Sequence, residues 1–264
     1  MKYKLVAIDL DDTLLKDDLT ISERVKKAIK ASIDKGTLVT FATGRMYASA
    51  LPYALDLNLD LPLITYQGAL VKYADGREIY HRPLELPLAR EVVEFLKPKN
   101  LHINVYLNDI LCMEKITEEG KNYSALVGIP IHQIRFPDDI TIPVTKIVLI
   151  GDKEELDPVE VEIEERFKDT INSTRSKPYF LEIAHPLATK GNALKKLANS
   201  LGIKREEVIA IGDSMNDYDM IEYAGFGVAM ANGIEAVKDI ADYITTSNED
   251  DGVAEVFEKF VLKK

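Results

Sequence analysis

The sequence predicts an α/β fold, with a parallel-sheet core into which an α+β domain is inserted. Three observations lead to this prediction. Short β-rich runs alternate with helical patterns in the first part of the chain, the pattern changes between about residues 83 and 186, and the alternation then returns. Strands that alternate with helices form a parallel sheet with helices on both faces. We therefore expect a core of residues 1–82 and 187–264 and an inserted domain of residues 83–186.

The first part of the chain supplies three predicted strands, in "KLVAIDL", "TLVTFAT" and "LPLITY". The segment "TISERVKKAIKASIDKG" has apolar residues at helical spacing, with Thr20 or Ser22 as the N-cap and Gly36 at the end. A second helical or broken-helical piece is expected in "YASALPYALDL". The segment "ALVKYADGREIYHRPL" predicts a hairpin whose turn is Asp75-Gly76.

The inserted domain is expected to contain helices and strands of its own. Its predicted elements are "LAREVVEFLKP", "LHINVYL", "TKIVLIG", "EELDPVEVEIEERFK" and "PYFLEIA", and Pro83 and Pro186 mark the expected hinges. Core alternation resumes in "KGNALKKLANSLGI", "EVIAIGDS", "MIEYAGFGVAM" and "GIEAVKDIADYITT". The simplest account is a continuous insertion between two halves of one core.

Composition and charge narrow the functional classes. The 264 residues are 46% hydrophobic and 29% charged, with a net charge of -11, which argues against nucleic acid or an anionic membrane as the main partner. No apolar run approaches the length of a membrane span. The N-terminal sequence meets Asp9 too early for a signal peptide, and the single Cys112 cannot form an internal disulfide. We expect a reduced, cytoplasmic protein.

Three of the predicted strands end in side chains that suit phosphate and metal chemistry. Asp9 and Asp11 follow the first strand, Thr43 follows the second, Asp213 follows a later one, and Lys190 opens a helix. Ligands of open parallel sheets bind at the carboxyl ends of the strands. Asp9, Asp11 and Asp213 would form a hard-oxygen site that suits Mg²⁺. Thr43, the backbone N–H groups after it and Lys190 would hold a phosphate.

The segments "DLDDT", "ATGR", "KGNAL" and "GDSMND" resemble, in this order, the four motifs of the haloacid dehalogenase (HAD) superfamily. The place of the insertion resembles the Cof-type branch of this superfamily, which has a C2 (type B) cap. Each motif alone is weak, but four in order, each at a predicted strand end or helix start, form a specific signal. The resemblance covers the whole chain. It implies a Rossmann-like core and an Mg²⁺-dependent phosphatase of small phosphate monoesters, such as sugar phosphates or related metabolites.

The resemblance also implies a role for each matching residue. Asp9 would attack phosphorus to give an aspartyl-phosphate, and Asp11 would protonate the leaving alcohol, so the pKa of Asp11 should lie above that of Asp9. Mg²⁺ would bind the Asp9 carboxylate, the Asp11 carbonyl oxygen and Asp213. Asp217 would orient Lys190 or a metal-bound water. The phosphate-binding group would be Leu10, Thr43, Gly44, Lys190 and Asn216.

Some positions depart from the family pattern or leave a choice open. Asp12 stands where Gly is frequent, and we interpret it as a turn residue. Gln67, in "YQGA", stands where the branch usually has Asn, and its extra methylene puts a substrate contact in doubt. Arg45 pairs either with a core carboxylate or with the substrate.

The insertion has a physical purpose if the protein is an enzyme. The loop after Asp11 is too short to roof the site, whereas a hinged domain could close over it and exclude water. The residues predicted to lie near this roof are Arg175, Lys177 and Tyr179.

Two other functions remain open at this stage. A phosphomutase would use the same aspartyl-phosphate but would release an isomerised sugar phosphate. A non-enzymatic module that senses phosphate or a metal would need no cap, so the insertion argues against it.

Overall fold

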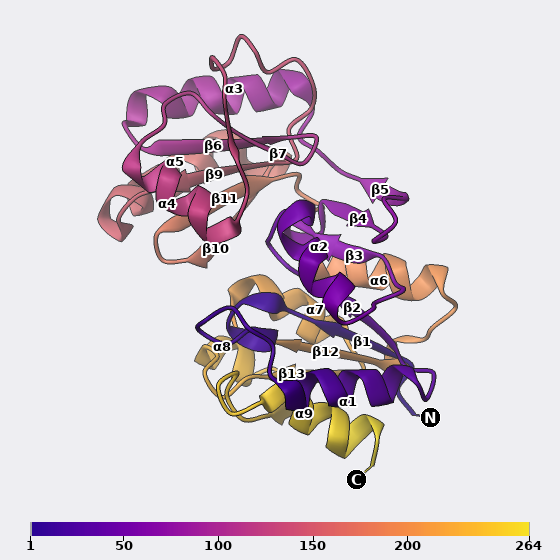
Figure 1. The fold of residues 1–264 in the computed structure, drawn as a ribbon. Coiled ribbons are helices and arrows are strands. Elements are labelled where there is room, and N and C mark those ends of the chain that lie inside the picture. The colour runs from indigo at the N-terminus through magenta and orange to yellow at the C-terminus, as the bar shows by residue number, and fades with distance from the viewer. Residues whose placement is uncertain (1, 264) are drawn as a thin grey trace.

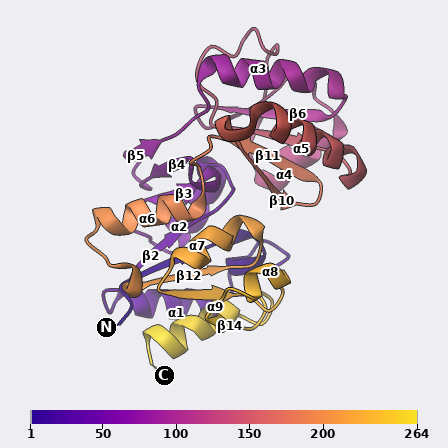
Figure 2. The same cartoon turned by 180° about the vertical axis from the view of Figure 1, so that it is seen from behind.

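A computed structural model describes residues 2–263 and shows two domains, drawn as separate lobes in Figure 1. One lobe has a parallel sheet between helices, and the other has a separate sheet that is mainly antiparallel. Figure 2 shows the same separation from behind. The predicted fold class, a parallel-sheet core with an inserted α+β domain, is confirmed.

The core sheet has the strand order β14-β13-β12-β1-β2, and all of its pairs are parallel. The strands are β1 (Leu5–Ile8), β2 (Leu38–Phe41), β12 (Val208–Gly212), β13 (Phe226–Ala229) and β14 (Tyr243–Ile244). In register, Leu5 of β1 lies opposite Leu38 on one side and Val208 on the other. The first strand of the chain is therefore an inner strand, held by segments from both halves of the sequence.

Helices cover both faces of the core sheet. They are α1 (Glu23–Ile33), α2 (Tyr47–Asp56), α6 (Lys190–Ser200), α7 (Tyr218–Tyr223), α8 (Glu235–Lys238) and α9 (Gly252–Val256). Along β1, Val6 and Ile8 belong to the apolar cluster of α1 and α9, whereas Leu5 and Ala7 belong to that of α6 and α7. Successive strand residues point to opposite faces, so burial of both faces explains the continuous apolar run.

The local signals of the sequence mark turns and helix ends as expected. Ser22, rather than Thr20, caps α1 by accepting a hydrogen bond from the Val25 N–H at 3.2 Å. The predicted hairpin forms with Asp75 in its turn. Its strands belong to a small antiparallel sheet of β3 (Leu63–Thr65), β4 (Leu70–Lys72) and β5 (Glu78–His81). A single parallel bridge between Ala42 and Ile64 links this sheet to the core.

The second domain contains a six-stranded sheet of order β10-β11-β9-β6-β7-β8. Its strands are β6 (His102–Leu107), β7 (Ile110–Met113), β8 (Ile131–Gln133), β9 (Lys146–Ile150), β10 (Asn172–Lys177) and β11 (Phe180–Ala184), and its helices are α3 (Leu86–Leu96), α4 (Glu118–Val127) and α5 (Lys153–Phe167). These elements lie inside the predicted insertion, whose exact boundaries, residues 83 and 186, remain a prediction. We call this domain the cap.

The cap contains four elements that the sequence did not predict: β7, α4, β8 and β10. The helix α4 has Gly120 in its first turn, and β10, "NSTRSK", is polar and only half-buried, so neither shows a clear apolar period. Among the helices of residues 2–263, none combines the length and the apolar character that crossing a membrane requires.

Candidate active site

The carboxyl ends of the core strands bring the predicted catalytic side chains together. Asp9 follows β1, and its N–H continues the ladder to the Ile211 carbonyl at 3.0 Å. Asp213 follows β12, on the neighbouring strand, and Thr43 comes two residues after β2, on the other side. Because parallel strands end at one edge of a sheet, these residues converge there.

Lys190 joins two of the acidic residues. It is the first residue of α6, its side chain is fully buried, and its Nζ donates to Asp9 Oδ1 and to Asp217 Oδ1, each at 2.6 Å. Burial by itself would lower the pKa of Lys190, but the two carboxylates outweigh burial and raise it. Lys190 is therefore a buried cation between two carboxyl groups, and not a surface lysine.

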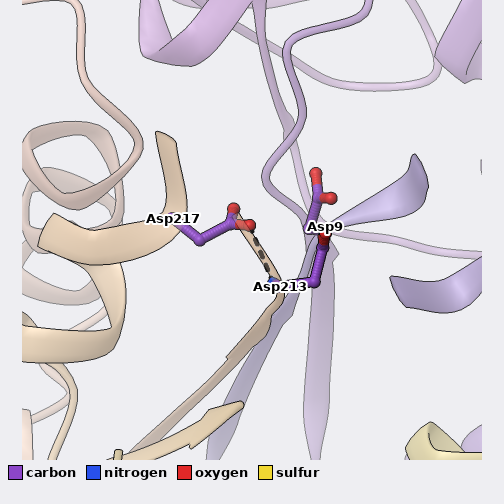
Figure 3. Close-up of side chains that lie close together, drawn as sticks. All are labelled: Asp9, Asp213 and Asp217. Atoms are coloured by element: carbon purple, nitrogen blue, oxygen red, sulfur yellow. Dashed lines mark hydrogen bonds between the residues drawn. The ribbon is translucent and has the colours of Figure 1, made fainter. Parts of the chain in front are cut away.

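Three buried carboxylates form a possible metal site. One carboxylate oxygen from each of Asp9, Asp213 and Asp217 lies within 4.8 Å of the other two (Figure 3). Asp217 is already engaged, because Oδ1 accepts from Lys190 and Oδ2 accepts from the backbone N–H groups of Asp213 and Ser214 at 3.0 and 3.1 Å. Asp217 thus positions both Lys190 and the Asp213 loop. The remaining oxygens of Asp9 and Asp213 are hard donors of the kind that a divalent cation prefers.

Electrostatics also fit a cation at this position. Burial raises the pKa of Asp9 well above its usual value, against the opposing effect of Lys190, and the charges of Asp217 and Asp213 add to the rise. Burial and the charge of Asp217 raise the pKa of Asp213 to about 7. Each carboxylate is thus disfavoured as an anion in the protein alone, and a bound metal ion would reverse this preference.

Asp11 has a different partner, which corrects one prediction. Arg45 holds its carboxylate through two hydrogen bonds, from Nε at 2.9 Å and from Nη2 at 2.7 Å. Burial raises the pKa of Asp11, but the bonds and charge of Arg45, with the charges of Lys177 and Lys190, lower it overall. In the absence of a bound metal ion, the pKa of Asp11 therefore lies below that of Asp9, the reverse of the predicted order. Of the two partners left open for Arg45, the structure shows the carboxylate in the core.

The predicted phosphate-binding residues lie in the loops after β1, β2 and β12 and at the start of α6. Thr43 is fully buried, and its hydroxyl accepts from the Arg45 N–H at 3.1 Å, so it caps the turn that carries Gly44. Leu10 is fully buried in the turn directly after Asp9. Asn216 lies on the loop after β12, and its Nδ2 donates to Gln67 Oε1 at 3.2 Å.

Asp12 is a turn residue, as interpreted, and it also contacts the cap. Its φ of +59° lies in the left-handed region, where Gly is favoured and Asp is tolerated. Its carboxylate forms an ion pair with Lys177 of β10, and its carbonyl accepts from Asn232 Nδ2 at 2.7 Å. The turn that contains Asp12 therefore forms a hydrogen bond within the core and an ion pair with the cap.

A cavity of about 90 Å³ lies between the two domains. From the core it is lined by Asp9, Asp11, Asp12, Gly44, Arg45, Asp213, Ser214 and Asn216. From the cap it is lined by Tyr123, Leu126, Val127, Lys146, Ser176, Lys177, Phe180 and Glu182. The cap therefore roofs the acidic cluster.

Of the three cap residues predicted at the roof, only Lys177 lines this cavity. Arg175 instead binds acidic residues of α5, Glu160 and Asp157, through Nε at 2.9 Å and Nη2 at 3.0 Å. Tyr179 lines a separate cavity within the cap. Regular alternation would place Arg175 and Lys177 on one face of β10, but the register of the strand shifts between them, and carboxylates on α5 bind the Arg175 guanidinium.

Most residues of the roof were not predicted from the sequence. Tyr123, Leu126 and Val127 come from α4, which the sequence did not predict, and Lys146 and Glu182 come from strands whose charges it did not consider. A usable signal was present, because each of these two charges is the single charged residue within a short apolar strand, "KIVLI" and "FLEIA". A charge in such a strand requires a buried partner.

Comparisons with known proteins agree with this architecture. A family profile described as haloacid dehalogenase-like hydrolase matches residues 6–257. A Bacillus subtilis protein, 5-amino-6-(5-phospho-D-ribitylamino)uracil phosphatase YitU, is 32% identical, with 98% of each chain covered.

Among solved structures, a haloacid dehalogenase-like hydrolase from Bacteroides thetaiotaomicron has 35% identity and a TM-score of 0.90, covering 98% of this chain and 99% of the other. A sugar phosphatase of HAD subclass IIB has 26% identity and a TM-score of 0.86, covering 97% and 98%. With the site geometry, these matches show that the chain belongs to the haloacid dehalogenase-like hydrolase family and is a phosphatase of that superfamily.

Proposed function

We propose that the protein is an Mg²⁺-dependent phosphatase that hydrolyses small phosphate monoesters through an aspartyl-phosphate on Asp9. The observation that carries this proposal is the clamp on Asp9, whose Oδ1 accepts from the buried Lys190 at 2.6 Å. The clamp fixes the direction of the carboxylate and supplies a cation where phosphate charge would arrive.

Asp9 attacks phosphorus in the first step, and we assign the attack to the carboxylate oxygen that Lys190 does not hold. A bond forms between this oxygen and phosphorus, the bond from phosphorus to the ester oxygen breaks, and Asp11 gives a proton to the leaving alcohol. In the second step water attacks phosphorus and gives its proton to Asp11. The bond to Asp9 then breaks, and inorganic phosphate leaves.

Asp11 must hold a proton for the first step, although Arg45 lowers its pKa before substrate is bound. We propose that the negative phosphate ester competes with Asp11 for the Arg45 guanidinium. Loss of this partner, together with the nearby negative charge of the substrate, would raise the pKa of Asp11. Arg45 would then serve both alternatives that its sequence left open, first the carboxylate and then the substrate.

Mg²⁺ would be held by the Asp9 carboxylate, the Asp11 carbonyl oxygen and Asp213, and it would offset negative charge at the phosphoryl group. Gly44 and Asn216, which line the cavity, would bind phosphoryl oxygens, with Thr43 bracing the turn from behind. Asp217 would keep Lys190 oriented.

We propose sugar phosphates or related small metabolites as the substrate class. The cavity between the domains is small, about 90 Å³, and charged and polar side chains of both domains line it, which suits a phosphorylated metabolite. The named activities of the relatives, a sugar phosphatase and a phosphoribitylamino-uracil phosphatase, make both substrates priority candidates. A cytoplasmic location and the absence of nucleic-acid and membrane partners remain predictions.

The test is a turnover screen with Mg²⁺ over phosphorylated sugars, the phosphoribitylamino-uracil compound and p-nitrophenyl phosphate. We expect release of inorganic phosphate, and a loss of at least about a thousandfold in kcat for Asp9→Asn. Retained activity in this variant would rule out the covalent mechanism. An isomerised sugar phosphate in place of free phosphate would identify a mutase. No turnover of any ester would favour a sensing module.

A further inference from the structure

The cap contributes a buried ion pair at its boundary with the core. Lys146, at the start of β9, and Glu182, in β11, are 2% and 5% exposed, and Lys146 Nζ lies 3.0 Å from Glu182 Oε2. The desolvation of a buried ion pair opposes its Coulomb attraction, so such a pair is a poor device for stability alone. The position of the pair at the boundary with the core therefore indicates a role other than stability.

Both members of the pair reach into the core. Lys146 Nζ donates to the carbonyl of Gly44, in the turn after β2, at 2.7 Å. Glu182 Oε2 accepts from Gln67 Nε2 at 3.1 Å, and Gln67 Oε1 in turn accepts from Asn216 Nδ2 at 3.2 Å. One pair in the cap is thus connected to two loops that line the catalytic cavity.

The turn that carries Gln67 also reaches the remaining catalytic loops. Gln67 has a φ of +56°, and its N–H donates to the Thr43 carbonyl at 3.0 Å. The next residue, Gly68, has a φ of +95°, and a Cβ there would lie 2.3 Å from the Thr189 carbonyl oxygen. Thr189 caps the helix that begins with Lys190. The turn is therefore packed between the Thr43 loop and the start of α6.

The arrangement can separate without leaving a charge unpaired. If the cap moved away, Lys146 and Glu182 would keep each other, and Glu182 Oε1 would keep the Ser176 hydroxyl at 2.7 Å. On the core side, Gln67 and Asn216 would also keep each other. Among the contacts of these side chains, the two that cross the boundary would be lost, from Lys146 to Gly44 and from Gln67 to Glu182.

We propose that Lys146, Glu182 and Gln67 form a cap bridge that positions the Gly44 and Asn216 loops for phosphoryl transfer. The proposal rests on the phosphatase function proposed above. The three are positioning residues, since they act through the backbone of Gly44 and the amide of Asn216. The extra methylene of Gln67 then has a use, because it carries the amide between Asn216 and the carboxylate of the cap.

The first test compares kinetics of Lys146→Met with Lys146→Arg and with Arg166→Met. Arg166 forms an exposed ion pair with Glu91 within the cap, so its loss is the matched control. We expect Lys146→Met to lower kcat by about 10- to 100-fold on p-nitrophenyl phosphate, with KM changed less than about threefold. Lys146→Arg should recover part of kcat, and Arg166→Met should match the wild type. A raised KM with unchanged kcat would instead make Lys146 a substrate contact and overturn the proposal.

A double variant separates positioning from folding. Removing one partner leaves a buried charge, whereas Lys146→Met with Glu182→Gln removes both charges, so Tm should recover in the double variant. Under the proposal kcat stays low in the double variant, because the contact with Gly44 is still missing. If kcat returned together with Tm, the pair would be only structural and the proposal would be wrong.

A third measurement does not depend on turnover. In the wild type and in Lys146→Met, hydrogen exchange should be followed in residues 43–45 and 214–217. We expect faster exchange in both loops of the variant, and unchanged exchange in the loops would overturn the bridge. Faster exchange in a protein that hydrolyses no phosphate ester would leave the bridge intact and overturn the proposed function alone.

Discussion

Two buried charge clusters lie close together in this molecule, and they are built on opposite principles. The core cluster sets the carboxylates of Asp9, Asp213 and Asp217 around a single cation, Lys190. The cap cluster sets one carboxylate, Glu182, against one cation, Lys146, and satisfies both with further hydrogen bonds. The first has excess negative charge, whereas the second is balanced.

This difference in net charge indicates which of the two clusters would bind a ligand. Burial, together with the charges of neighbouring carboxylates, raises the pKa of Asp9 and Asp213, so this cluster favours a bound cation or protons. The balanced cap pair has no such demand and can serve as a fixed connector. Both clusters are buried, so they differ in the balance of charge, and we expect the unbalanced cluster to be the one that binds a ligand.

Among the variants that test this comparison of the two clusters, Lys190→Met is expected to lose the most stability. Removal of the cation leaves two buried carboxylates, so the free energy of unfolding should fall by about 3–5 kcal/mol at pH 8 without metal. Lys146→Met should lose less, since only Glu182 is left and two other donors still bind it. Urea unfolding of both variants checks this, and equal losses would contradict the distinction.

The second effect depends on pH. The folded-state pKa of Asp213 is about 7, above an unfolded value of about 3.9, so the folded state binds more protons between these values. Its contribution to stability therefore falls as pH rises from about 4 to about 7. Without metal, Asp213→Asn should be more stable than the wild type at pH 8, by on the order of 2–4 kcal/mol.

The control for this prediction is the same pair of proteins at pH 4, close to the pKa of Asp213 in the unfolded state. There the carboxyl is protonated in the folded state and about half protonated in the unfolded state, so the gap in unfolding free energy should nearly vanish. A gap that stays constant across the pH range would show that Asp213 does not titrate as its surroundings imply.

The third effect is stabilisation by the metal. At a concentration a hundred times its Kd, Mg²⁺ should stabilise the fold by about 2.7 kcal/mol and raise Tm by roughly 5–10 °C. Asp213→Asn should lose this response, whereas Lys146→Met should keep it, because the cap pair takes no part in metal binding. Thermal scans with Mg²⁺ and with a chelator test the prediction. A wild-type Tm that does not change with the chelator would count against it.

The smallest effect is expected for the half-exposed ion pair between Lys177 and Asp12. Solvent screens such pairs, so Lys177→Met should change the free energy of unfolding by less than about 1 kcal/mol. Urea unfolding at low and at high salt measures the change. A loss of unfolding free energy as large as that of Lys146→Met would contradict this prediction. Solvent exposure would then not distinguish the Lys177–Asp12 ion pair from the contact of Lys146 with Gly44.

Much of the core could be predicted from the sequence, because its signals are local. The strand of Leu5–Ile8 is apolar throughout since both of its faces are buried, and the acidic and hydroxyl residues directly after the strands reveal the catalytic edge. Asp9, Asp213 and Lys190 follow from this rule because each sits at a strand end or a helix start.

The cap contacts could not be predicted in the same way. The pKa order of Asp9 and Asp11 depends on Arg45, which the fold brings from 34 residues away. Two partners of Glu182, Gln67 and Lys146, lie 115 and 36 residues distant, and no local pattern names them. Arg175 and Lys177 are similar in sequence terms, yet one binds α5 and the other meets Asp12. Which way a polar side chain on a half-buried strand turns is decided by tertiary partners.

The order of strands in the core has a consequence for how the protein is made. Strand β1 lies between β2 and β12, and β12 follows about 200 residues later, as does Asp213 relative to Thr13. All strands of the cap sheet come from one uninterrupted stretch of chain. During synthesis, all strands of the cap sheet are made before β12. The cap sheet can thus form while β1 is not yet paired with β12. We expect the cap to fold first in the nascent chain, and the edge of the core sheet that carries Asp9 and Asp213 to form last.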